Sequence, residues 1–159
     1  MIRTAILTVS DSAIAGTRAD ASGPALAARI NELGWIVVAT AQVADSQPDI
    51  GAKLCEWSDA GHALILTTGG TGLSARDVTP EATRSVLDRE IPGIAEWMRT
   101  RGMEQTKLAV LSRALAGQRK QSLIVNLPGS PRGALFSLQA IEHLIPHIVD
   151  LMRGKTEHS

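Results

Sequence analysis

Short apolar runs alternate along this chain with stretches in which apolar residues recur at helical spacing. In residues 24–33, for example, Leu26, Ile30 and Leu33 lie on one helical face, and Gly34 ends the pattern. The strand-like runs are Arg3–Ser10, Trp35–Gln42, Ala63–Thr67 and Ser122–Leu127. Strands that alternate with helices build βαβ units. The pattern therefore predicts an α/β fold, a three-layer α/β/α sandwich with a mostly parallel sheet.

Capping residues and prolines predict where the other helices begin. Ser46, followed by Pro48, starts a helix that runs to about residue 60, and Thr79 is expected to cap the next one, with Pro80 at its first position. Further helices are predicted over residues 92–105 and 130–153, the last one kinked at Pro146. The apolar run 108–111 is ambiguous between helix and strand.

Composition narrows the class of protein. The 159 residues suit one domain, 1–159, and 16 basic residues balance 16 acidic ones, so a protein that coats nucleic acid or an anionic membrane is disfavoured. With one cysteine, a disulfide framework is excluded. No apolar run approaches the roughly 20 residues of a membrane span, and no export signal is evident. We therefore expect a cytoplasmic protein with no membrane or nucleic-acid partner.

The balanced charge conceals a strong polarity along the chain. Residues 105–141 contain five basic residues and no acidic one. The acidic loops that follow the predicted strands lie earlier in the sequence. A single site is thus able to combine metal-binding carboxylates with phosphate-binding cations.

The most distinctive loop follows the third predicted strand. Gly69, Gly70, Thr71 and Gly72 lack the spacing of a P-loop, yet glycines let backbone N–H groups approach a phosphate closely. An ordinary turn between strand and helix is the alternative. Ligands of parallel α/β sheets bind outside the carboxyl ends of the strands, where this loop is expected.

Two aspartates at strand ends are candidate magnesium ligands. Asp77 follows the glycine loop, and Asp45 follows the second predicted strand. Mg²⁺ takes one or two carboxylates together with phosphate oxygens. A helix-start or turn residue is the alternative for each, and Asp49 competes with Asp45 for the second position.

Two other segments carry phosphate-binding potential. The Pro128–Pro131 turn places Pro128, Gly129 and Ser130 at a helix N-terminus, which is an anion site by geometry, although a rigid connector explains it as well. A basic stretch precedes this turn, and its charge suits binding of polyphosphate or a phosphorylated substrate, with a solvated hairpin as the alternative. Its candidate ligands are Ser112, Arg113, Arg119 and Lys120. Ser10 and Asp11 close the first strand.

The remaining histidines, serines and tryptophans form no pattern that indicates a metal site or a catalytic triad. His143 and His147 are four residues apart, but Pro146 and the lack of a third ligand disfavour zinc. No Ser-His-Asp arrangement stands out. Trp57 and Trp97 are expected in the core or at a subunit contact.

Taken together, these loops resemble the MogA/MoaB family of molybdenum-cofactor biosynthesis, which includes the G domain of gephyrin. The motifs that carry the resemblance are TVSD (8–11), D-x-S-G (20–23), LILTTGGTG (64–72), RDVTPEA (76–82), IPG (91–93), SRA (112–114) and LIVNLPGSP (123–131). They cover most of the chain, in order and at the family's spacing.

The resemblance implies the MoaB/Mog fold, a homotrimer, molybdopterin binding and, for MogA-like members, Mg²⁺-dependent adenylylation of molybdopterin by ATP with release of pyrophosphate. It maps the family's two critical aspartates onto Asp77 and Asp45. A separate protein or domain then inserts molybdenum. Two alternatives stay open: a non-catalytic molybdopterin-binding module or scaffold, and a nucleotide pyrophosphatase-like hydrolase.

On this basis we expect a role for each candidate residue. Asp45 and Asp77 would be catalytic and hold Mg²⁺. The nucleotide and its phosphates would be bound by Ser10, Asp11, Gly69, Gly70, Thr71, Gly72, Pro128, Gly129 and Ser130. The pterin phosphate or the departing pyrophosphate would face Ser112, Arg113, Arg119 and Lys120.

Overall fold

A six-stranded sheet forms the centre of the computed structural model, which describes residues 1–155. The strand order is β2–β1–β3–β6–β5–β4. The strands are β1 (Arg3–Val9), β2 (Ile36–Val43), β3 (Leu64–Thr68), β4 (Arg89–Glu90), β5 (Ala116–Arg119) and β6 (Ser122–Leu127). β2, β1, β3 and β6 are parallel to one another, whereas β5 is antiparallel to both β6 and β4. The predicted mostly parallel sheet is confirmed.

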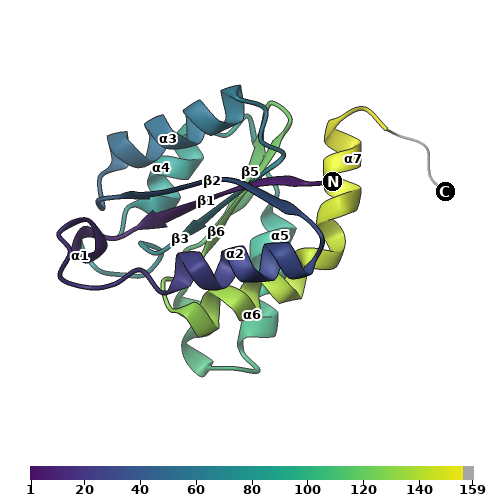
Figure 1. Cartoon of the computed structure of the whole chain (residues 1–159). Coiled ribbons are helices and arrows are strands. Elements are labelled where there is room, and N and C mark those ends of the chain that lie inside the picture. The colour runs from purple at the N-terminus through teal and green to yellow at the C-terminus, as the bar shows by residue number, and fades with distance from the viewer. Residues whose placement is uncertain (156–159) are drawn as a thin grey trace.

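Helices cover both faces of this sheet (Figure 1). They are α1 (Asp11–Ile14), α2 (Ser22–Glu32), α3 (Gln47–Asp59), α4 (Thr79–Val86), α5 (Pro92–Gly102), α6 (Pro131–Ile141) and α7 (Ile145–Met152), with short 3₁₀ helices η1 (Lys107–Leu111) and η2 (Glu142–Leu144). α3 and α4 lie on one face, and α2, α5 and α6 lie on the other. The predicted three-layer sandwich is therefore confirmed.

Alternating side chains on the strands supply both halves of the core. On β1, Ile6 packs toward the α2 and α6 side, while Ala5 and Leu7 pack toward α3. Successive side chains of a strand point to opposite faces, so a strand buried on both faces is apolar throughout, as the sequence of β1 indicated. The first core also holds residues of α7, such as Val149.

Several predicted boundaries are wrong in detail. Thr79 is the first residue of α4 rather than its cap, because Val78 occupies the capping position without a side-chain bond. The predicted helix over 130–153 is interrupted by η2, and Pro146 lies in the first turn of α7, where its missing N–H costs no hydrogen bond. The ambiguous run 108–111 lies in η1.

The carboxyl ends of β1, β2, β3 and β6 meet at one edge of the sheet, near α1 on the left of Figure 1. β2 follows β1 in the chain and pairs with it on one side, whereas β3 pairs with β1 on the other side and is followed outward by β6. The strand order thus reverses between β1 and β3, which is where open α/β sheets bind ligands. Within residues 1–155, no helix is long and apolar enough to cross a membrane.

Candidate active site

Two adjoining cavities open at this edge of the sheet. The first, about 330 Å³, has Asp20, Asp45 and Asp77 in its wall and is called the carboxylate cavity here. The second, about 450 Å³, has walls from α5, η1 and α6 and is called the apolar cavity. Ser130 lines both cavities, and the glycine loop 69–72 separates them, with Gly69 and Gly70 on one side and Thr71 and Gly72 on the other.

The glycine loop packs too closely for side chains at two of its positions. Gly69 and Gly70 have positive φ angles of 102° and 69°. A Cβ on Gly69 would collide with the carbonyl oxygen of Val9, and one on Gly70 would collide with the hydroxyl of Thr79. Gly129 is also close, since a Cβ there would lie 3.3 Å from the Cα of Gly69. These approaches bring the ends of β1, β3 and β6 together.

Asp45 is held by a reciprocal pair of hydrogen bonds with Asp11. The Asp11 N–H donates to Oδ2 of Asp45 at 3.0 Å, and the Asp45 N–H donates to Oδ1 of Asp11 at 2.9 Å. The remaining oxygen of Asp11 accepts from Nε and Nη2 of Arg76, at 2.9 Å and 2.8 Å. Asp11 does not line either cavity. It positions Asp45, a different contribution from the phosphate contact predicted for it.

Asp77 is fixed from the opposite side of the carboxylate cavity. Its Oδ2 accepts from the Ser74 N–H at 3.0 Å. Arg113 holds the surrounding segment: its guanidinium donates to the carbonyl oxygens of Gly72 and Asp77 at 2.8 Å and 2.9 Å, and to both carboxylate oxygens of Glu81 at 2.8 Å. The Arg113 side chain is thus engaged in supporting the loop.

Burial and charge set the ionisation of the two neighbouring carboxylates. Burial raises the pKa of Asp45 above its ordinary value, and the nearby negative charges of Asp11 and Asp77 add to the increase. The pKa of Asp11 is lowered, first by the Asp45 N–H and then by Arg76. A cation bound between neighbouring carboxylates stabilises the ionised form of each, and it therefore offsets the effect that raises the pKa of Asp45.

The donor set fits magnesium that is shared with a substrate phosphate. Within residues 1–155, no group of three or more His, Cys, Asp or Glu side chains could hold a metal by itself. Asp45 and Asp77 line the same cavity. Mg²⁺ is commonly held by one or two carboxylates plus phosphate oxygens, and this cavity offers the protein's share of such a site.

Backbone donors for phosphate come from the start of α6. Ser130 caps this 11-residue helix, because its hydroxyl accepts from the Gly133 N–H at 3.1 Å. Gly129, Ser130 and Pro131 line the carboxylate cavity. The Pro128 carbonyl accepts from the Thr68 hydroxyl at 2.6 Å, which ties this turn to the end of β3. The positive end of the helix therefore faces the cavity.

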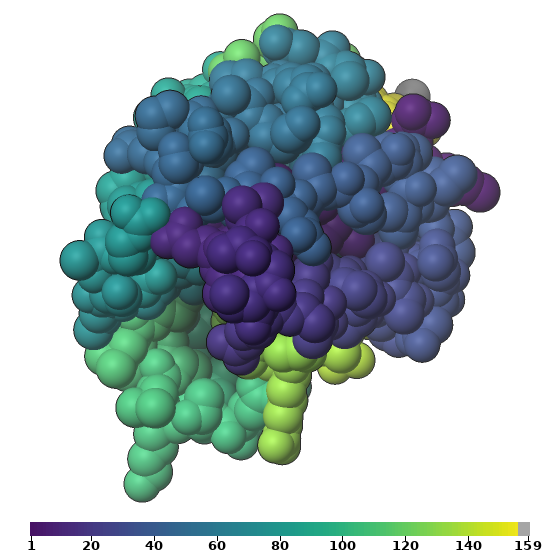
Figure 2. Space-filling model, turned by 60° about the vertical axis from the view of Figure 1, so that its left-hand side comes forward, coloured from purple at the N-terminus to yellow at the C-terminus, as the bar shows by residue number. Residues whose placement is uncertain are grey.

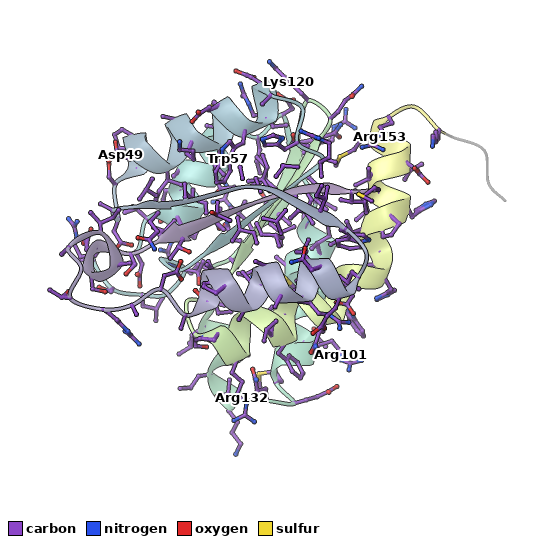
Figure 3. The ribbon with its side chains drawn as sticks, viewed as in Figure 1. Asp49, Trp57, Arg101, Lys120, Arg132 and Arg153 are labelled. Atoms are coloured by element: carbon purple, nitrogen blue, oxygen red, sulfur yellow. The ribbon has the colours of Figure 1, made fainter. Side chains whose placement is uncertain are left out.

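Two predicted residues lie away from both cavities. Arg119 and Lys120 form the β5–β6 hairpin, where β6 begins, so they lie at the opposite edge of the sheet from the strand ends. The Lys120 ammonium donates to Asp59 at 2.6 Å, and Arg119 donates to the Val86 carbonyl at 3.1 Å. Figure 3 shows Lys120 at the far end of α3 from Asp49. Neither residue lines either of the two cavities, and the pair forms the hairpin that was the alternative to a contact with the pterin phosphate.

The remaining predicted residues divide between the cavities. Ser10 lines the carboxylate cavity, and Ser112 and Pro128 line the apolar one. Asp45 rather than Asp49 reaches the cavity, since Asp49 lies exposed in the first turn of α3. Trp57 is buried, with 5% of its surface exposed, and packs in the core, whereas Trp97 is 42% exposed.

Sequence reasoning missed the apolar cavity and the cation of the carboxylate cavity. The cation is Arg18, which precedes α2 in an exposed loop and belongs to no recognisable motif. Asp20, the first residue of the D-x-S-G motif, precedes Ala21 at the N-cap of α2; it accepts from the Gly23 N–H at 2.9 Å and also lines this cavity. The apolar run in η1 was a signal for the second cavity, because Leu108 and Leu111 face it.

Comparison with known proteins places this arrangement in a family. Residues 5–147 match the model of a probable molybdopterin binding domain. A molybdopterin adenylyltransferase of Helicobacter pylori J99 is 39% identical over 156 residues, covering 96% of this chain and 89% of that protein. The molybdopterin adenylyltransferase of Escherichia coli K12 is 38% identical, covering 96% and 86%.

A solved structure agrees closely with the fold. The molybdopterin biosynthesis enzyme MoaB of Thermus thermophilus superposes with a TM-score of 0.92 at 49% identity, covering 98% of each chain. The chain belongs to the MogA/MoaB molybdopterin-binding family of molybdenum-cofactor biosynthesis.

Proposed function

We propose that this protein transfers the adenylyl group of ATP to molybdopterin, giving adenylyl-molybdopterin and pyrophosphate. The observation that carries the proposal is the placement of Asp45 and Asp77 in one cavity with the glycine loop and the start of α6. Relatives named molybdopterin adenylyltransferase, 38–39% identical, support the choice of reaction.

The reaction needs no nucleophile from the protein. An oxygen of the terminal phosphate of molybdopterin forms a bond to the α-phosphorus of ATP, while the bond from that phosphorus to the bridging oxygen of pyrophosphate breaks. Catalysis then depends on alignment and on neutralising charge. Asp45 and Asp77 would hold Mg²⁺, which when bound supplies positive charge to the phosphates. Gly70 and the α6 N-terminus would orient the phosphates through backbone N–H groups, whereas the Gly69 N–H already donates to the Leu127 carbonyl.

The two cavities give each substrate a place. We assign the nucleotide phosphates to the carboxylate cavity and the pterin to the apolar cavity, next to Ser112. Because Ser130 lines both, the two reacting phosphates would meet beside it. Asp11 and Arg113 act as positioning residues, since they hold the loops that carry Asp45 and Asp77.

We also propose the homotrimer that the family resemblance implies, with the exposed face of Trp97 as a candidate contact and a molybdenum-insertion protein as a later partner. Sedimentation equilibrium tests the trimer directly.

Pyrophosphate release tests the activity. Purified protein with molybdopterin, ATP and Mg²⁺ should release pyrophosphate in an amount equal to the adenylylated product. Molybdopterin binding without release would instead support the non-catalytic module. Release of phosphate products from ATP without molybdopterin would support a hydrolase.

A further inference from the structure

The carboxylate cavity contains one basic side chain, and the proposed reaction assigns it no role. Among the residues that line this cavity, three are acidic, Asp20, Asp45 and Asp77, and one is basic, Arg18. A nucleoside triphosphate is strongly anionic, so a wall with this excess of carboxylates repels it unless cations compensate. A divalent ion held between Asp45 and Asp77 would offset that repulsion only for phosphate oxygens close to these two residues.

The other arginines near the site are already engaged. Nε and Nη2 of Arg76 contact Asp11 at 2.9 Å and 2.8 Å. All three nitrogens of the Arg113 guanidinium donate within the protein, to Glu81 and to two carbonyl oxygens. Within residues 1–155, by contrast, no carboxylate lies within 4.0 Å of the Arg18 guanidinium. Arg18 is the cation of this cavity that remains available to a ligand.

The backbone fixes Arg18 at the cavity mouth while its side chain stays exposed. Gly16, at a φ of 73°, turns the chain back after α1, and the Ser12 carbonyl oxygen then accepts from the N–H groups of Thr17 and Arg18 at 3.1 Å and 3.3 Å. The Thr17 hydroxyl donates to the same oxygen at 3.2 Å. In Figure 2, the purple segment that contains α1 and this turn stands at the front, above the yellow-green start of α6.

Position decides which phosphates Arg18 meets. The reacting α-phosphorus must lie where the two cavities adjoin, beside Gly70 and Ser130. Arg18 lies on the wall formed by β1 and the start of α2, and no residue of this wall lines the apolar cavity. A guanidinium there faces the phosphates that leave. Arginine is suited to the task, since its planar N–H groups bind phosphate oxygens in pairs.

We propose that Arg18 binds the β- and γ-phosphates of ATP and thereby makes the carboxylate cavity selective for a nucleoside triphosphate over a monophosphate. The inference rests on the proposed adenylyl transfer. It assigns Arg18 to the departing pyrophosphate, on the opposite side of the α-phosphorus from the pterin.

The test compares affinities for α,β-methylene-ATP and for AMP by isothermal titration calorimetry with Mg²⁺. Arg18→Gln should weaken binding of α,β-methylene-ATP about tenfold, as expected for loss of a charge-assisted contact, and should change AMP binding less than about twofold. Arg18→Lys should recover part of the loss. Arg132→Gln is the matched control, because Arg132 is in the first turn of α6 but points away from the molecule in Figure 3.

Each other outcome has a defined meaning. If Arg18→Gln binds α,β-methylene-ATP as tightly as Arg132→Gln does, the role of Arg18 is refuted while the proposed function stands. An equal loss for AMP and for the triphosphate analogue would place Arg18 at the nucleoside or α-phosphate and would also refute the assignment. If the wild-type protein binds no nucleotide, the proposed function and this inference both fail. Thermal melts of the three variants check that each one is folded.

Discussion

The carbonyl oxygen of Val9, at the end of β1, lies directly against Gly69, at the end of β3, in the space that a Cβ would occupy. Gly69 also donates its N–H to the Leu127 carbonyl at 3.1 Å, so a single residue joins the ends of three neighbouring strands. Close contact of the strands at this point brings the carboxylates and the phosphate donors within one cavity. Glycine is required here for both its conformation and its size.

We predict that Gly69→Ala destabilises the fold and abolishes nucleotide binding, because the φ of 102° and the collision with Val9 penalise the methyl group together. The matched control is Gly61→Ala, at a φ of 82° with open space around the added atom. That variant should lose only about 1–2 kcal/mol, the cost of a left-handed conformation. Urea unfolding of both variants measures the difference; equal losses would contradict the steric account.

The reciprocal bonds between Asp11 and Asp45 predict graded effects of substitution. Asp11→Ala removes the acceptor of the Asp45 N–H, so it should lower the melting temperature and weaken nucleotide binding in the presence of Mg²⁺. Asp11→Asn retains an acceptor oxygen and should cause the smaller defect in both. Differential scanning fluorimetry with and without Mg²⁺ and α,β-methylene-ATP measures both quantities. Identical behaviour of the two variants would show that Asp11 acts through its charge alone.

Asn126 connects three parts of the core through buried hydrogen bonds. Its amide group donates to the hydroxyls of Thr67 and Thr83 at 2.9 Å each and accepts from the Leu115 N–H at 3.2 Å. Asn126→Ala should therefore cost about 3 kcal/mol of unfolding free energy, because buried polar partners lose their bonds. Urea denaturation compares it with Asn31→Ala at an exposed position of α2. A loss below about 1 kcal/mol would show that the network contributes little.

The burial of His62 leads us to predict that the protein becomes less stable in mild acid. Burial lowers its pKa below the usual 6.5, and the positive charge of Arg3 adds to the shift. Below pH 6.5 the unfolded chain binds a proton that the folded chain does not, so the unfolding free energy should fall as the pH drops through this range toward the folded pKa.

The measurement for His62 is urea unfolding between about pH 7.5 and about pH 5, a range that spans the ordinary pKa of histidine. His62→Gln should flatten the pH dependence of the unfolding free energy, whereas His147→Gln, at an exposed position of α7, controls for removal of an imidazole. A wild-type slope in His62→Gln would locate the acid sensitivity elsewhere.

Much of the fold was predictable because it follows from local patterns. The apolar runs of β1, β3 and β6 and the caps Ser46 and Ser130 are local signals, and the structure confirms them. The meeting of Asp45 and Asp77 followed from the rule that parallel strand ends share an edge. Both side chains do line one cavity.

Other features depend on tertiary contacts that the sequence pattern does not encode. Proximity in sequence grouped Arg119 and Lys120 with Ser112, but β5 reverses direction and carries both residues to the opposite edge. Arg113 has its charge satisfied by Glu81, a pairing that spans 32 residues. Arg18 belongs to no motif, and its position in the cavity wall depends on the folding of α1 and α2 around the cavity.

Adenylyl transfer by Asp77→Asn, compared with the wild type, tests the central claim most directly. The amide keeps the size of the side chain and removes the charge that is proposed to hold Mg²⁺, so it acts mainly on the transition state. Mass spectrometry of reactions with molybdopterin, ATP and Mg²⁺ should show adenylylated molybdopterin with the wild type. The variant should turn over more slowly by a factor of about 100 or more, with ATP affinity within a few-fold of the wild type. Wild-type turnover by Asp77→Asn, or no adenylylated product with the wild-type protein, would contradict the account.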